Sequence, residues 1–271
     1  MSITPFVAAV LFGYFLSFAL YFFNFETSGE RLAGLDRKIM GASLAGHGLV
    51  LAALFTRHHD TARASQGIYS LVFLVLLVSF FLEGRYRARY LTLFSLPITL
   101  LFGVFALLLS HGRQAGTGIL GARFLWLHLG LILAGFACLL TAASSALMYL
   151  VQSRQLKSKH PGRSSLKLPS LDTLDRLHFG SLVWGVVLFS LGILTGLFEV
   201  KSIGGVRDLL ADPRVILSFL TCGMYWLILG FRLSSLRRGQ KIAASTLAIF
   251  ALLILTWVSS YACPRGFHRG L

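Results

Sequence analysis

Residues 126–157 read WLHLGLILAGFACLLTAASSALMYLVQSRQLK, and no Asp, Glu, Lys or Arg occurs before Arg154. A helix needs about 20 apolar residues to cross the hydrocarbon layer of a membrane. Because lipid offers the backbone no hydrogen-bond partner, a stretch of this kind has to satisfy its own amides within a helix. The stretch therefore predicts a transmembrane helix whose basic end emerges at one membrane surface.

Seven further apolar blocks of similar length flank this one along the chain of 271 residues. With the first block they predict spans at about 3–24, 39–56, 67–83, 90–110, 124–151, 179–199, 214–235 and 242–262. Charged residues make up only 13% of the chain, whereas soluble domains carry about 25%. The short alternating strands of a membrane barrel are absent from the pattern. We therefore expect an all-α polytopic transmembrane bundle of eight spans.

We expect the whole chain, 1–271, to form a single membrane domain, with four spans in 1–120 and four in 121–271. The first block begins at Ile3 without a basic segment before it. A cleaved signal peptide normally has such a segment, so the block is interpreted as a permanent span.

The formal net charge of +15 would suggest nucleic-acid binding in a soluble protein. Here the basic residues lie between apolar blocks and not on a soluble module, which excludes nucleic acid as a partner and makes the lipid bilayer the expected one.

Of the 25 Lys and Arg residues, most fall in the loops after spans one, three, five and seven. The nine others are Arg57, Arg63, Arg113, Arg123, Lys201, Arg207, Arg214, Arg265 and Arg269. Because cytoplasmic loops carry the excess of Lys and Arg, this bias places both termini outside.

The three cysteines, Cys138, Cys222 and Cys263, form no CxxC pair. This spacing gives no support to a zinc site, to thioredoxin-like chemistry or to covalent attachment of haem. No GxSxG, HExxH or P-loop motif occurs either. The chain is therefore not expected to be an enzyme, and a binding, assembly or transport role is favoured.

Histidine is the informative residue type, since an ionisable side chain in a membrane is costly and marks a candidate functional site. On the expected topology, His128 lies at the outer start of span five and His268 just beyond the outer end of span eight. His47 lies near the middle of span two, between Gly46 and Gly48. Each histidine has a plainer interpretation: His128 and His268 as interfacial polar caps, and His47 as a neutral ring bonded to a neighbouring helix.

Two outer imidazoles from distant parts of the chain could bind the two faces of one haem, whose iron takes one or two axial ligands. The haem propionates would then need arginine partners, which bind carboxylates through two hydrogen bonds. In this interpretation the cofactor is haem b, His47 is a further candidate contact within the membrane, and Arg123, Arg214 and Arg265 are among the outer arginines that could bind the propionates. The alternative is that these arginines are ordinary loop charges.

The longest cytoplasmic segment, 152–178, begins with the basic run QSRQLKSKHPGR and ends in LPSLDTLDRLH. The basic part suits a solvated face near anionic headgroups. Leucines follow at three-residue spacing from Leu168 to Leu177, and Ser170 could cap a short helix there.

Several segments in the second half resemble the integral-membrane cytochrome c assembly family, which includes the CcsA and HemX-like proteins. The resemblance begins with the histidine-bearing helix 126–157 and continues through LPSLDTLDRLHFGSLVWGVVLFSLGILTGLF, residues 168–198. Within it, LGILTG at 191–196 is similar to the TxGxxxG-like pattern of the family. RRGQKIAAS at 237–245 and GFHRG at 266–270 are similar to its basic turn and its closing segment.

The resemblance implies a membrane protein of cytochrome c biogenesis, located in the bacterial inner (plasma) membrane. It implies that His128 and His268 match the two outer haem-ligating histidines of the family, and that partners include apocytochrome c or other assembly proteins. The loop FEVKSIGGVRDLLADPRV, at 198–215, lacks the tryptophan-rich WWD motif of the family, and only Asp212-Pro213-Arg214 resembles its Asp-Pro-Lys. The in-membrane histidine of the penultimate helix is replaced in LILGFRL, at 227–233.

These departures favour the HemX-like branch, which is associated with haem homeostasis and with control of glutamyl-tRNA reductase. Three functions therefore stay open at the level of sequence. The chain could bind and present haem outside the membrane, or regulate haem synthesis through its cytoplasmic loop. It could also be a small-molecule transporter without haem.

Overall fold

The computed structural model describes residues 4–27, 34–57, 64–109, 122–157, 168–200, 213–234 and 239–262. These residues form eight α-helices and no strand. The helices are α1 (Thr4–Thr27), α2 (Leu35–Arg57), α3 (Ala64–Arg85), α4 (Leu91–Leu109), α5 (Ala122–Lys157), α6 (Leu171–Val200), α8 (Pro213–Ser234) and α9 (Gln240–Ala262). Each of the eight predicted spans corresponds to one of them.

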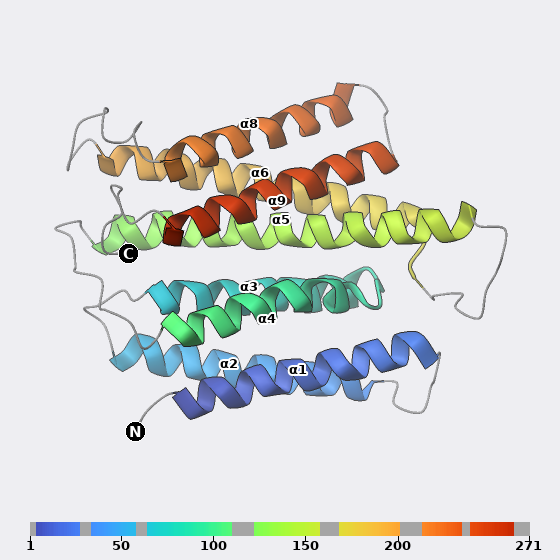
Figure 1. Cartoon of the computed structure of the whole chain (residues 1–271), viewed down its shortest axis with the longest axis horizontal. Coiled ribbons are helices and arrows are strands. Elements are labelled where there is room, and N and C mark those ends of the chain that lie inside the picture. Colours follow the sequence, from blue (N-terminus) through green and yellow to red (C-terminus); the bar gives the residue numbers. More distant parts are fainter. Residues whose placement is uncertain are drawn as a thin grey trace.

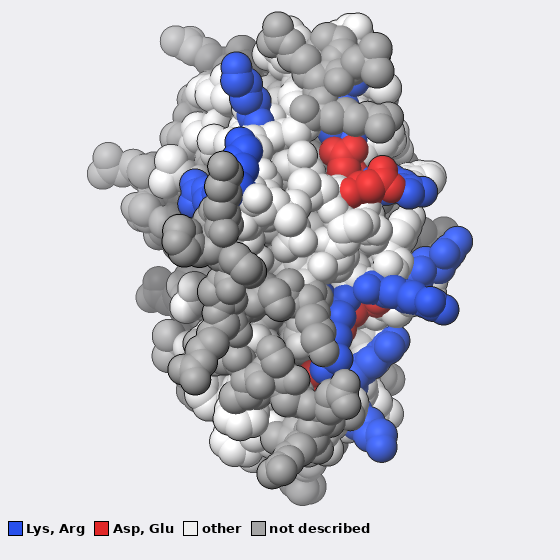
Figure 2. Space-filling view, turned by 90° about the vertical axis from the view of Figure 1, so that its right-hand side faces the viewer, with Lys and Arg blue, Asp and Glu red and all other residues white. Residues whose placement is uncertain are grey.

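The helices run up and down along one axis, so consecutive helices are antiparallel (Figure 1). α1 begins and α9 ends at the same end of the bundle, which agrees with the prediction that both termini share one side. We call this the outer end and the opposite one the cytoplasmic end, following the charge bias. Figure 2 looks onto the cytoplasmic end, where Lys and Arg side chains gather around a smaller number of acidic ones.

Six of the described helices are long and apolar enough to cross a membrane, judged by length and composition. The apolar parts of the other two, Leu91–Leu107 and Gln240–Thr256, are shorter. The predicted fold class, a polytopic helical membrane bundle, is confirmed.

The cytoplasmic segment after span five differs from the prediction. α5 continues to Lys157, and α6 already begins at Leu171 and not near residue 179. Ser170 does cap a helix, because its Oγ accepts a hydrogen bond of 3.3 Å from the Thr173 backbone N–H. That helix is not a separate short one but the start of α6, held in place because Leu174 and Leu177 are buried in one cluster with Met148 of α5.

Two large apolar clusters divide the bundle into halves that meet along α3 and α4. One joins α1, α2, α3 and α4, and includes the fully buried rings of Tyr14 and Tyr21. The other joins α5, α6, α8 and α9 around Phe136, and it also takes in Leu71 and Val75 from α3. α3 therefore belongs to both halves and couples them.

The contact between α5 and α6 is the most extensive in the bundle, and glycines make it close. A Cβ on Gly135 would lie 2.6 Å from the Phe189 backbone nitrogen, and one on Gly185 would lie 2.8 Å from Leu139. A Cβ on Gly192 would lie 2.7 Å from Ile132. Small residues at such positions let two membrane helices approach until their backbones touch. We call this contact the glycine seam.

The glycine seam should not tolerate an added methyl group. Gly135→Ala is expected to destabilise the bundle by about 1–3 kcal/mol, because its Cβ meets backbone atoms that cannot rotate away. Gly130→Ala on the same helix is the matched control, since a Cβ there meets nothing within 4 Å. Thermal unfolding midpoints of the two variants in one detergent measure the difference. Equal midpoints would show that the seam is not tightly packed.

Candidate functional site

The predicted ligand His128 lies in the second turn of α5 at the outer end, partly buried against α6. Its Nδ1 is 2.7 Å from the carbonyl oxygen of Gly192. A carbonyl can only accept a hydrogen bond, so Nδ1 carries the proton and donates it. In the neutral imidazole, Nε2 is then the nitrogen with a free lone pair.

α6 leaves a place for this ring because it presents a glycine there. A Cβ on Gly196 would lie 2.8 Å from Cε1 of His128, too close for any real contact. Thr195 donates a hydrogen bond of 2.8 Å to the same Gly192 carbonyl. The segment 191–196, singled out in the sequence only as a family-like pattern, thus forms the support of the His128 ring.

The remaining predicted outer residues are placed only in part. Arg123 lies in the first turn of α5 and Arg214 in the first turn of α8, and both turns are at the outer end with His128. Their side chains lie outside what the structure describes, as do Arg265 and His268. α9, which precedes both of these residues, runs to Ala262 at the same end.

His47 occupies a different part of the bundle, in the cluster of α1 to α4. Its side chain is 3% exposed, and its Nδ1 shares a hydrogen bond of 2.9 Å with the Tyr14 hydroxyl. The rings of Tyr14, Tyr69 and Phe73 surround it, with centroids 5.7, 6.4 and 5.5 Å away. The structure therefore does not bring His47 and His128 into one site.

His178, expected at the cytoplasmic end of span six, lies two turns inside α6 and is buried. Its Nε2 is 3.0 Å from the Thr246 hydroxyl of α9. That hydroxyl donates its own proton to the Ile242 carbonyl, so it accepts from His178. This histidine links α6 to α9.

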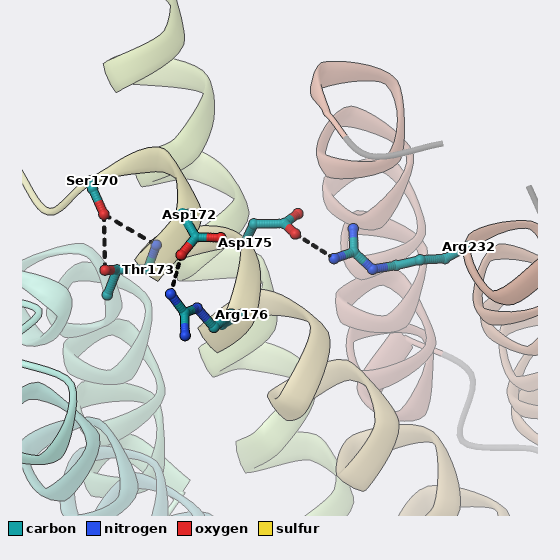
Figure 3. A network of polar contacts seen from close by, with 6 residues as sticks. All are labelled: Ser170, Asp172, Thr173, Asp175, Arg176 and Arg232. Carbon is teal, nitrogen blue, oxygen red and sulfur yellow. Dashed lines mark hydrogen bonds and ion pairs between the residues drawn. The ribbon is translucent and has the colours of Figure 1, made fainter. Parts of the chain in front are cut away.

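Beside it, Asp175 of α6 and Arg232 of α8 form a buried ion pair of 2.6 Å, with side chains 14% and 7% exposed. Figure 3 shows this pair next to the exposed ion pair of Asp172 and Arg176, which lies at the capped start of α6. The Arg232 guanidinium also lies 4.8 Å above the Phe179 ring. Sequence reasoning missed this pair, although an arginine at the end of an apolar block is a signal for a buried partner.

Antiparallel apolar helices that carry a preoriented imidazole at one end define the class of this molecule: a polytopic α-helical membrane protein. The sequence pattern of the family described as "Cytochrome C assembly protein" matches residues 62–268, well over half of the chain. The chain belongs to this family. The family prediction is thereby confirmed, and the match extends from the seam helices back to α3.

Individual relatives are more distant. "Protein HemX" of Brevibacillus brevis is 29% identical over 143 residues, which cover 52% of this chain and 52% of HemX. "Cytochrome c biogenesis protein CcsA" of Prochlorococcus marinus subsp. pastoris is 22% identical over 243 residues, 81% of this chain and 77% of CcsA. "Inner membrane protein YpjD" of Escherichia coli is 28% identical over 133 residues, 49% of each chain. The chain thus spans about half the length of HemX and of YpjD, and no solved structure matches it.

The buried ion pair gives a stability test. Asp175→Asn is expected to cost about 3–5 kcal/mol, because it leaves the Arg232 charge buried without its counterion. Asp172→Asn removes the exposed ion pair with Arg176 from the same turn and should cost about 0.5 kcal/mol or less. Unfolding midpoints of both variants check this. A loss at Asp172 as large as that at Asp175 would contradict it.

Proposed function

We propose that this chain is a membrane protein of cytochrome c biogenesis that binds haem at the outer end of the bundle. His128 is the first axial ligand and His268 the second. The observation that carries the proposal is the hydrogen bond of 2.7 Å from His128 Nδ1 to the Gly192 carbonyl. Histidines that bind metals commonly donate their other ring nitrogen to a carbonyl or carboxylate, which fixes the tautomer and orients the ring.

The residues around His128 suit this role in three ways. The bond to Gly192 directs the proton to Nδ1 and leaves Nε2 free to coordinate iron. Gly196 leaves room for the ring, and partial burial limits access of water to it. When bound, haem would supply an iron centre and two propionates, and the chain would hold and orient them without changing the covalent structure of haem.

The arginines near the outer helix ends complete the proposed site. Arg123 and Arg214, at the outer starts of α5 and α8, and Arg265 are proposed to bind the haem propionates. His47, in its own aromatic enclosure, is proposed as a separate contact for haem within the membrane. The cofactor proposed is haem b, and the proposed recipient is apocytochrome c or another assembly protein.

The proposal includes a location and a division of the chain. The family membership and the six membrane-length helices support a multi-pass protein of the bacterial inner membrane, oriented with both termini outside. The single domain 1–271 is proposed to consist of two four-span parts, 1–120 and 121–271. The separate apolar cluster of α1 to α4 supports this division, and α3, which joins both clusters, supports their union in one domain.

A second candidate function is regulation of haem synthesis from the cytoplasmic side, and the similarity to "Protein HemX" favours it. The proposed partner is glutamyl-tRNA reductase, and the proposed contact is the segment 152–178. At its described edges this segment exposes charges of both signs: Asp172 and Arg176 are 60% and 71% exposed. Such charges are available to a soluble partner.

Haem loading tests the first function. Purified protein titrated with haem is expected to give a Soret band, and the double variant His128→Ala, His268→Ala should lose it. His128→Ala alone should weaken binding by at least about tenfold, which equals one lost interaction of about 1.4 kcal/mol. The variant should still insert and stay folded, since the apolar faces of α5 remain.

Matched variants separate ligation from packing. His178→Gln keeps a donor for Thr246 and should leave the Soret band unchanged. Gly196→Ala should weaken haem binding because its Cβ displaces the His128 ring, whereas Gly180→Ala on the same helix meets nothing within 4 Å. A wild-type protein that shows no band after loading would reject haem binding and favour a transporter without haem.

Co-purification tests the second function. Glutamyl-tRNA reductase is expected to be retained by the wild-type protein and by His128→Ala, but not by a variant in which a Gly-Ser linker replaces residues 158–167. These residues lie between α5 and α6, so both helices keep their full length. Retention by the linker variant would contradict a contact made by residues 158–167, and loss in His128→Ala would contradict a contact confined to the cytoplasmic segment.

A further inference from the structure

A cavity of about 310 Å³ opens at the cytoplasmic end, on the half of the bundle remote from His128. The ends of α1 and α3, the start of α2 and the connection from α3 to α4 enclose it. Three arginines, Arg37, Arg87 and Arg89, line it together with two carboxylates, Asp36 and Glu83. Whether this cavity holds an anion depends on which of these charges are already paired.

Glu83 is 6% exposed, and both of its oxygens are used within the protein. Oε1 accepts a hydrogen bond of 3.1 Å from the Tyr21 hydroxyl. Oε2 accepts one of 3.1 Å from the Thr92 backbone N–H at the start of α4. This carboxylate therefore ties three helices together at the base of the cavity.

Asp36 is 2% exposed and is used in the same way at the start of α2. Its Oδ2 accepts a hydrogen bond of 3.0 Å from the Asn24 side chain of α1. Its Oδ1 accepts backbone N–H groups of Gly34 and Arg37 at 3.2 and 2.8 Å. Each oxygen of both carboxylates therefore accepts at least one hydrogen bond from the protein.

Arg37 interacts electrostatically with the Glu83 carboxylate, but among the described residues none of the three arginines forms an ion pair. Across the described ranges, the ion pairs lie on α6 and α8 only, so no carboxylate lies within 4.0 Å of these guanidinium nitrogens. Aromatic rings hold two of them: Arg37 lies 5.1 Å above Phe80, and Arg89 lies 5.1 Å above Tyr90. A ring contact covers the face of a guanidinium and leaves its N–H edge free to bind an oxyanion.

The connection from α3 to α4 has a conformation that carries Arg87 and Arg89 at the cavity. Arg87 and Tyr90 have φ angles of 50° and 78°, a left-handed conformation that non-glycine residues rarely adopt. Hydrogen bonds hold the turn: Ala88 N–H donates to the Glu83 carbonyl at 3.1 Å, and the Tyr90 hydroxyl donates to the Asn24 carbonyl at 3.4 Å. Such strain persists only where the surroundings impose it.

The surroundings indicate which anion fits. The cavity lies at the end that the charge bias places in the cytoplasm, where the headgroups of that leaflet are expected. Close in sequence to the lining residues, Phe22, Leu35 and Phe81 expose large apolar side chains. A phosphate attached to acyl chains matches both features, and basic pockets between helices on the cytoplasmic side bind anionic lipid headgroups in this way.

We propose that the cavity binds the phosphate of an anionic phospholipid through Arg37, Arg87 and Arg89, with the acyl chains on the apolar residues beside it. The bound lipid joins α1 and α2 to the turn between α3 and α4. The site is independent of the proposed haem site, because it lies at the opposite end and in the other apolar cluster.

Native mass spectrometry of the protein released from nanodiscs tests this. In discs of phosphatidylcholine with a minor share of phosphatidylglycerol, the wild-type protein is expected to retain one phosphatidylglycerol. The double variant Arg87→Gln, Arg89→Gln should lower that occupancy by about tenfold, because it removes two charge-assisted contacts. The matched control is Lys38→Gln, Arg85→Gln, which removes two exposed charges from the same helix ends but outside the cavity.

Three outcomes would overturn the proposal. The control pair could lose the lipid as fully as the cavity pair, which would mean a diffuse basic surface. The wild-type protein could retain phosphatidylcholine equally well, which would mean no anion site. Finally, glycerol 3-phosphate could raise the thermal unfolding midpoint in neutral detergent as much as phosphatidylglycerol does, which would mean a site for a free phosphoester and not for a lipid.

Discussion

The backbone contact between α5 and α6 is the constraint on which the rest of the structure depends. Lipid gives apolar helices little reason to prefer one another over acyl chains, so close packing must supply the association. Gly135, Gly185 and Gly192 provide it by letting each helix reach backbone atoms of the other. The seam positions recur on α5 at steps of four, three and four residues, from 128 to 139, and on α6 at the same steps in reverse. This repeat fixes the antiparallel register.

The candidate site around His128 is part of the glycine seam and lies at its outer end. One step beyond the contact of Gly192 with Ile132, the residue of α5 is His128 and its counterpart on α6 is Gly196. The register that packs the helices therefore also brings the imidazole to the Gly192 carbonyl. At the cytoplasmic end, α6 carries different groups: His178 and Asp175 are directed to α9 and α8. Polar contacts thus link α6 to its neighbours at the cytoplasmic end, while His128, the proposed ligand, lies at the other.

The cavity that is proposed to bind phosphate is built differently, with its charged residues arranged in two layers. The carboxylates of Asp36 and Glu83 are buried within the bundle. They accept hydrogen bonds from Asn24, Tyr21 and backbone amides. The arginines lie outside and keep their N–H groups for a ligand. In the sequence, the three arginines were counted only as loop charges that set the orientation. Asn24 and Glu83, two polar residues near the ends of apolar blocks, were the signal that could have found the network.

Hydrophobicity and charge along the chain were enough to predict eight helices, the membrane class, and a position for His128 at the bundle end where α1 begins and α9 ends. The reason is that spans need apolar length and loops need basic residues. The family-like pattern at 191–196 was visible too, but not its role. Only the tertiary structure decided that these residues support His128, that α6 begins at Leu171, and that Asp175 meets Arg232. The reason is physical: each of these features depends on the rotation and register of one helix against another. Those are set by close packing at glycines, which hydropathy does not record.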